Sequence, residues 1–122
     1  MAAGLHQQLS MLDPLAGKLE YYMDLLSARQ KLVASNIANA DTPGYKTKDI
    51  DFQTEFANAM GGGPNAIEAQ GLAVRNDGNN VSIDREARLL SENALRFSIA
   101  SNLLRDQIRI AKEAINGGGG GL

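Results

Sequence analysis

The sequence predicts an all-α fold in which an N-terminal and a C-terminal helix pair as an elongated, antiparallel, coiled-coil-like hairpin, with a poorly ordered glycine-rich middle. Two observations carry this prediction. Apolar residues recur at helical spacing over about 12–40 and again over 83–115, whereas residues 60–80 read MGGGPNAIEAQGLAVRNDGNN. The expected division is a flexible N-terminus over 1–11, a helix over 12–41, a turn motif and loose middle over 42–82, a helix over 83–116 and a flexible tail over 117–122.

The first helix has a recognisable start. Asp13 can cap its first backbone N–H groups, and Pro14 suits the first helical position. Apolar side chains then recur with a spacing that gives the helix one broad apolar face. The predicted packing residues on this face are Leu19, Leu26 and Val33.

The second helix shows a longer apolar repeat, which runs in steps of four and three from Ile83 to Ile115. A repeat sustained over this length is typical of coiled coils. Either Asn80 or Ser82 can cap the start of this helix. Its predicted packing residues are Leu90, Phe97, Leu104 and Ile108.

Further apolar side chains lie beside these seams. They are Leu25 and Leu32 on the first helix and Ile99, Leu103 and Ile110 on the second. A hairpin buries only one face of each helix, so these side chains are expected to remain exposed and to mark an interaction surface. Two interpretations stay open for them: contacts between subunits, or the filling of one small core.

Composition argues against several functional classes. The chain has 122 residues, and 12 Lys+Arg against 14 Asp+Glu offer no electrostatic reason to expect a nucleic acid partner. It contains no cysteine, and its single histidine, His6, lies in a polar N-terminal segment. Asp49, Asp51 and Glu55 are the only compact carboxylate cluster, and no histidine or cysteine accompanies them. We therefore expect no catalytic residue, no cofactor and no metal site.

Targeting signals are also missing from the sequence. The first ten residues carry neither a basic segment nor a continuous apolar stretch of the kind found in a secretory signal peptide. No stretch approaches the roughly 18 apolar residues that a membrane-spanning helix requires. We expect no direct membrane span, and any exit from the cytoplasm needs a route that does not read a cleaved signal.

A helix stop and a turn follow the first helix. Pro43 fixes its own φ and Gly44 permits a positive φ, so residues 42–45 suit a type II turn. Thr42 precedes a proline, which pushes it toward extended geometry, so the helix should stop near residue 40 or 41. Asparagines at such an end can bond to nearby backbone groups. The residues of this motif are Asn36, Asn39, Thr42, Pro43, Gly44 and Tyr45.

The same run resembles the N-terminal signature of the flagellar rod and hook protein family. The resemblance rests on SNIAN at 35–39 followed by TPGYK at 42–46. The continuation DIDF at 49–52 and the segment NALRF at 93–97 resemble the branch that forms the proximal rod. The short chain agrees with that branch, because distal rod and hook relatives carry large domains in the middle.

The resemblance implies a non-enzymatic structural subunit of the bacterial flagellar basal body. Such subunits polymerise through their terminal helices into the hollow drive shaft that crosses the periplasmic space, transmits torque and passes exported subunits. The implied partners are other copies of the chain, FlgC-like rod neighbours, and a FliE-like adaptor and the type III export gate at the base. Synthesis in the cytoplasm and export without a cleaved signal peptide are implied as well.

One short motif has a more specific implication. Phe52 and Phe56 resemble the aromatic motif by which some rod and hook subunits dock at the export gate. Two aromatics four residues apart also form an ordinary helix pair, so both interpretations stay open. Two alternatives remain for the whole chain: another axial rod protein such as FlgC, or a soluble helical-hairpin adaptor. A generic adaptor has no reason to carry the run at 39–46.

Overall fold

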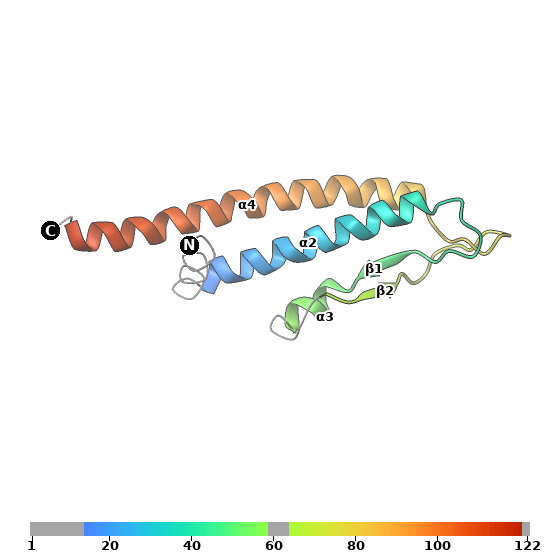
Figure 1. The fold of residues 1–122 in the computed structure, drawn as a ribbon, viewed down its shortest axis with the longest axis horizontal. Coiled ribbons are helices and arrows are strands. Elements are labelled where there is room, and N and C mark those ends of the chain that lie inside the picture. The colour runs from blue at the N-terminus through green and yellow to red at the C-terminus, as the bar shows by residue number, and fades with distance from the viewer. Residues whose placement is uncertain (1–13, 59–63, 121–122) are drawn as a thin grey trace.

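The chain forms three layers along one long axis (Figure 1). The structure, a computed structural model, describes residues 14–58 and 64–120. Helix α2 (Pro14–Ala38) lies between helix α4 (Ile83–Gly120) and an arm made of strand β1 (Lys48–Ile50), helix α3 (Phe52–Ala57) and strand β2 (Ala66–Glu68). The predicted flexible N-terminus over 1–11 and the Asp13 cap lie outside the described residues.

The two long helices pair in antiparallel fashion, which confirms the predicted fold class. Hydrogen bonds between their side chains fix the direction. Asn36 near the end of α2 bonds to Glu86 near the start of α4, and Gln30 bonds to Asn93 further along. The sum of each pair of residue numbers stays nearly constant, as antiparallel helices of equal rise require.

The first helix ends at Ala38, and the type II turn follows as predicted. The backbone N–H of Asn39 donates to the carbonyl of Ser35 at 3.0 Å, and the side-chain amide of Asn39 donates to the same oxygen at 2.9 Å. Gly44 has a φ of +77°, and the N–H of Tyr45 donates to the carbonyl of Thr42 at 3.2 Å. Glycine takes this left-handed conformation without the strain of a Cβ atom.

The second helix begins under a cap from Ser82, whose hydroxyl accepts the N–H of Arg85 at 3.2 Å. It continues to Gly120, whereas the sequence predicted an end at 116 and a flexible tail over 117–122. The helix therefore extends four residues beyond the predicted end, and no proline interrupts it there. Residues 121 and 122 lie outside the described part of the chain.

The middle of the chain differs from the loose segment that the sequence predicted. Strands β1 and β2 pair antiparallel, with Lys48 opposite Glu68 and Ile50 opposite Ala66. Helix α3 is capped by Asp51, whose carboxylate accepts the N–H of Thr54 at 3.3 Å and its hydroxyl at 2.9 Å. The arm folds back along α2, so the described residues of 42–58 and 64–82 have defined positions rather than forming an open loop.

The seam between α2 and α4 lies one residue earlier on α4 than predicted over its first half. Glu86, Leu89, Asn93 and Ala100 are buried there, whereas Leu90 and Phe97, which were predicted to pack, are each 39% exposed. The prediction from the apolar repeat missed this buried face because two of its residues, Glu86 and Asn93, are polar. The repeat therefore selected the neighbouring apolar face of the helix. Leu104 and Ile108 are half-buried, so the two descriptions converge toward the C-terminal end.

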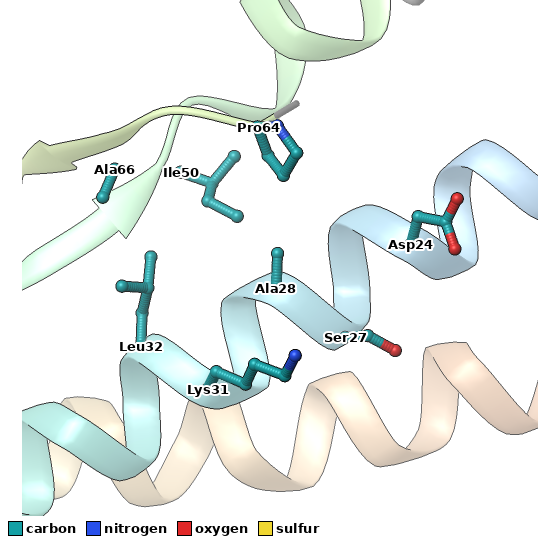
Figure 2. A pocket seen from close by; sticks show the side chains of 8 residues that line it. All are labelled: Asp24, Ser27, Ala28, Lys31, Leu32, Ile50, Pro64 and Ala66. Carbon is teal, nitrogen blue, oxygen red and sulfur yellow. The ribbon is translucent and has the colours of Figure 1, made fainter. Parts of the chain in front are cut away.

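On α2, Leu26 and Val33 are buried and Leu19 is half-buried. Leu25, for which contacts between subunits and core filling were both left open, is fully buried, so it fills the core and is not available to a neighbour. Leu32 is half-buried and lies under the arm. Figure 2 shows Leu32 and Ala28 directed from α2 toward Ile50 and Ala66 of the arm across a small hollow.

Candidate functional site

Asn36 joins both helices and the arm at one point. Its side-chain nitrogen donates to the Glu86 carboxylate at 2.6 Å and to the Lys48 carbonyl at 2.8 Å. Its side-chain oxygen accepts the N–H of Lys48 at 3.1 Å and the hydroxyl of Tyr45 at 2.9 Å. Asn36 and Glu86 are fully buried. A buried amide with every polar atom bonded specifies one arrangement of its neighbours.

Asp49 of β1 extends this network to charged side chains. Arg29 of α2 holds the two carboxylate oxygens with its Nε and Nη2 atoms, each at 2.8 Å. Arg85 of α4 bonds to one of the same oxygens and also to Glu86, at 2.7 Å. We call Arg29, Asn36, Asp49, Arg85 and Glu86 the clasp. The side chains of the clasp connect α2, the arm and α4.

The electrostatics of the clasp follow from its geometry. Burial by itself would raise the pKa of Asp49. Hydrogen bonds from Arg29, from the backbone N–H of Ile50 and from Arg85 outweigh that effect and hold the pKa below its ordinary value. The carboxylate is therefore ionised at neutral pH, and its negative charge faces both guanidinium groups, of which that of Arg85 also meets Glu86.

The turn motif is locked against the loop that leads into α4. The buried side chain of Asn79 donates to the carbonyls of Asn39 and Thr42 at 2.9 and 2.8 Å. The N–H of Gly44 donates to the carbonyl of Asp77 at 2.9 Å. Gly78 has a φ of +86°, and a Cβ atom placed on it would lie 3.3 Å from the Cα of Gly44. The two segments approach at their glycines, which sets the position from which α4 departs.

The two aromatic residues of the possible export motif pack against α2. Phe52 meets Tyr22 with ring centroids 6.1 Å apart, and Phe56 meets Tyr21 and Tyr22 at 6.2 and 6.3 Å. The guanidinium of Arg29 lies 5.1 Å from the Phe52 ring centroid. Phe56 is still 41% exposed. The pair thus anchors the end of the arm while one ring remains accessible.

Apolar side chains remain exposed along two sides of α4. The Phe97 edge consists of Ile83, Leu90 and Phe97, which are 39–50% exposed. The Leu103 edge consists of Ile99, Leu103 and Ile110, which are 48–51% exposed. The three residues predicted on this helix for contacts between subunits thus form the Leu103 edge. Of the residues predicted to pack on it, Leu90 and Phe97 lie on the Phe97 edge instead.

The described residues show few features of a reactive centre. Within 14–58 and 64–120, no group of three His, Cys, Asp or Glu side chains is placed to hold a metal ion. Over the same ranges, no helix combines the length and apolar character that crossing a membrane requires. The carboxylates of Asp49 and Glu86 are both engaged by arginine or amide groups.

Sequence reasoning identified the motif but not its partners. Asn36, Asn39, Gly44 and Tyr45 were recognised, and the structure gathers them at the junction of the three layers. Arg29, Arg85 and Glu86 were missed. Their helical spacing alone carries no signal, because a charged residue beside an apolar seam normally points to solvent. Glu86 does not fall on the apolar repeat that begins at Ile83, so the repeat gave no clue to its burial.

Comparison with known proteins identifies the class to which this arrangement belongs. Residues 23–46 match the family described as "Flagella basal body rod protein". This range includes Arg29 and Asn36 of the clasp and the turn motif. The class is therefore that of structural subunits of the flagellar basal body rod, which is not a class of enzymes.

Individual relatives narrow the assignment. The flagellar basal body rod protein FlgB of Escherichia coli is 31% identical over 81% of this chain and 93% of its own length. FlgB of Salmonella typhimurium is 29% identical over 88% of this chain and 99% of its own length, and FlgB of Cereibacter sphaeroides is 37% identical over 76% and 87%. The chain belongs to the FlgB family of flagellar basal body rod proteins.

Proposed function

We propose that this subunit polymerises through the paired helices α2 and α4 and forms part of the wall of the proximal rod. The observation that carries the proposal is the pair of apolar edges that α4 leaves exposed on either side of its seam. Isolated exposed apolar residues are normal, but continuous strips along a helix mark interaction surfaces. Family membership makes other rod subunits the natural partners for such strips.

The clasp supports a mechanical role for this arrangement. It connects both long helices and the arm through charge-assisted hydrogen bonds, so the three layers move as one body. A subunit that passes torque to its neighbours must not let its layers slide past each other. In our proposal the apolar edges carry the load between subunits, and the clasp carries it within each subunit.

The resemblance to rod and hook proteins supplies the remaining partners. We propose that the chain is made in the cytoplasm, is exported without a cleaved signal peptide and assembles in the periplasmic space. Its neighbours in the rod would be other copies of itself and FlgC-like subunits. At the base it would meet a FliE-like adaptor and the type III export gate.

Charge placed on an apolar edge tests the assembly proposal. Phe97→Glu should prevent rod formation, because a carboxylate in a subunit contact loses its hydration without gaining a partner. Asn102→Glu places the same charge on an exposed polar position of the same helix and should leave rods intact. Both variants replace the native copy in cells, and purified basal bodies are scored by electron microscopy.

Circular dichroism of the purified variants establishes that each one still folds. Rods of normal number in Phe97→Glu would refute the proposal. Loss of rods in both variants would also contradict it, since the effect would then not depend on the apolar edge.

We further propose that Phe52 and Phe56 contribute to docking at the export gate. The change Phe52→Ala/Phe56→Ala should lower the amount of chain that leaves the cytoplasm. Tyr22→Ala removes the ring that packs against both phenylalanines, so it loosens the arm but keeps the motif. Export that falls in the double variant and not in Tyr22→Ala supports docking, whereas unimpaired export in the double variant refutes it.

A further inference from the structure

The two sides of the helix pair differ in chemistry. Each side carries a shallow groove between α2 and α4. The groove at the Phe97 edge is lined by Leu26, Ser27, Gln30, Asn93, Ala94 and Phe97. The groove at the Leu103 edge is lined by Leu19, Tyr22, Arg96, Ile99, Ala100 and Leu103. The first groove combines Leu26 and Phe97 with small and amide side chains, and the second carries bulky apolar side chains and a guanidinium.

The Phe97 groove also holds an incomplete polar group. Asn93 is only 3% exposed, and its side-chain nitrogen donates to Gln30 at 3.3 Å. Its side-chain oxygen is buried and accepts no hydrogen bond from any residue that the structure describes. A buried acceptor left in this state is unfavourable, so an occupant of the groove that brings an N–H donor is favoured.

Charges along the two sides are complementary. Arg105 and Lys112 each lie four residues after a position of the Phe97 side, Ser101 and Ile108, so they border that side. Asp106 and Glu113 each lie three residues after Leu103 and Ile110, so they border the Leu103 edge. Arg109 approaches these two carboxylates at 3.6 and 3.8 Å, but all three side chains are more than half exposed. Pairs of this kind are weak and leave the carboxylates free to meet another cation.

We propose that the Leu103 edge of one copy of this chain seats in the Phe97 groove of the next copy, with the two α4 helices parallel and at nearly the same height. This arrangement places Arg105 and Lys112 of one copy opposite Asp106 and Glu113 of the other. It also brings Arg96, which borders the Leu103 edge, within reach of the Asn93 oxygen of its neighbour. The inference rests on the proposed polymerisation and specifies which surfaces meet.

The geometry of the contact has a consequence for assembly. The Leu103 edge and the Phe97 groove lie on opposite sides of the helix pair. Each copy can therefore bind one neighbour through its Leu103 edge and a second neighbour through its Phe97 groove. Contacts of this head-to-tail type produce rings or open helical assemblies rather than closed dimers. The alternative of two Phe97 edges facing each other would bring the basic borders together and leave the Asn93 oxygen without a donor.

Cysteine crosslinking distinguishes the two arrangements, since the chain contains no cysteine of its own. Ser101→Cys introduces a thiol on the Phe97 side, and Leu103→Cys introduces one on the Leu103 edge. The variant with both changes, placed in cells instead of the native copy and oxidised in purified basal bodies, should yield a ladder of multimers. Each single variant should yield none. The two positions point away from each other on one helix, so they cannot form a disulfide within a copy.

Every outcome in rod-bearing basal bodies bears on the inference. A ladder in the double variant alone supports it. Dimers in Ser101→Cys alone, products of a mass that does not fit copies of this chain, or no crosslink at all overturn it while leaving the proposed rod role intact. Rods of normal number in cells that lack this chain altogether would instead count against the proposed function.

Charge exchange provides an independent measurement. Arg105→Glu should lower swimming speed and rod number, because two carboxylates then face each other across the contact. Adding Asp106→Arg in the same chain restores opposite charges between copies and should recover both. A defect in Arg105→Glu that the second change does not relieve would overturn the arrangement.

Discussion

Replacing Asp49 with asparagine keeps the shape of the side chain but removes the charge that faces Arg29 and Arg85. The new amide would direct N–H groups at guanidinium groups, which have no acceptor. Hydrogen bonds to charged groups contribute on the order of 1.5–3 kcal/mol each. The arginine side chains are 21% and 18% exposed, and solvent reduces that contribution. We expect the free energy of unfolding to fall by about 3 kcal/mol.

Urea unfolding followed by circular dichroism measures this change in the purified chain. Asp106→Asn serves as the matched control, because its carboxylate also meets an arginine but is 58% exposed. The control should lose less than about 1 kcal/mol. A loss in Asp49→Asn no larger than in the control would refute the reasoning that the clasp connects the layers.

The pH dependence gives the same prediction a second test. The pKa of Asp49 is lower in the folded chain than its ordinary value, so the charge stabilises the fold above the unfolded pKa of about 3.9. That stabilisation is lost as the pH falls through the folded value. The difference in stability between wild type and Asp49→Asn should thus stay constant from neutral pH to about 5 and shrink below about 4. A difference that does not shrink in acid would contradict the assignment.

Three further changes test other parts of the structure. Gly78→Ala should destabilise the chain more than Gly71→Ala in urea unfolding. Both glycines have a positive φ, and the backbone strain of an alanine there costs roughly 1–2 kcal/mol. Only at Gly78 would the added Cβ atom also meet backbone, the Cα of Gly44 at 3.3 Å. Equal losses would show that the contact with Gly44 is unimportant. Tyr45→Phe removes one hydrogen bond to the clasp asparagine and should cost about 1 kcal/mol, again by urea unfolding, and no change would show that this bond contributes nothing. Leu104→Asp places a charge in the half-buried seam and should abolish rods in electron micrographs of basal bodies, whereas intact rods would defeat its seam assignment.

The helix pair and the turn were predictable because their signals are local. A proline followed by glycine determines the turn at 42–45 almost without reference to the rest of the chain. The long apolar repeat likewise predicts helix α4 from local sequence. The arm was not predictable, because its position depends on bonds between residues far apart in sequence. Asn36 holds the edge of β1, and the side chain of Asn80 accepts the N–H of Thr47 at 2.6 Å.

The predicted position of the seam on α4 was wrong for a different reason. Burial of Glu86 is favourable only because Asn36 and Arg85 supply donors, and neither donor is visible as a partner until the chain is folded. An apolar repeat treats such a position as surface. Leu25 was likewise expected to remain exposed, although it is fully buried. The candidate site was thus half predicted: its motif residues were recognised, and the charges that complete it were not.

The antiparallel pairing also determines how the subunit responds to a pull. The first turn of α2 and the later turns of α4 lie at the same end of the molecule, and the clasp lies at the other. A force that draws the chain out from its N-terminal end separates the layers one turn after another, because each turn of α2 touches only the facing parts of α4 and of the arm. No step breaks many contacts at once until the clasp is reached. A narrow conduit could therefore thread this chain with little resistance, whereas a load applied along the assembled pair meets all of those contacts together.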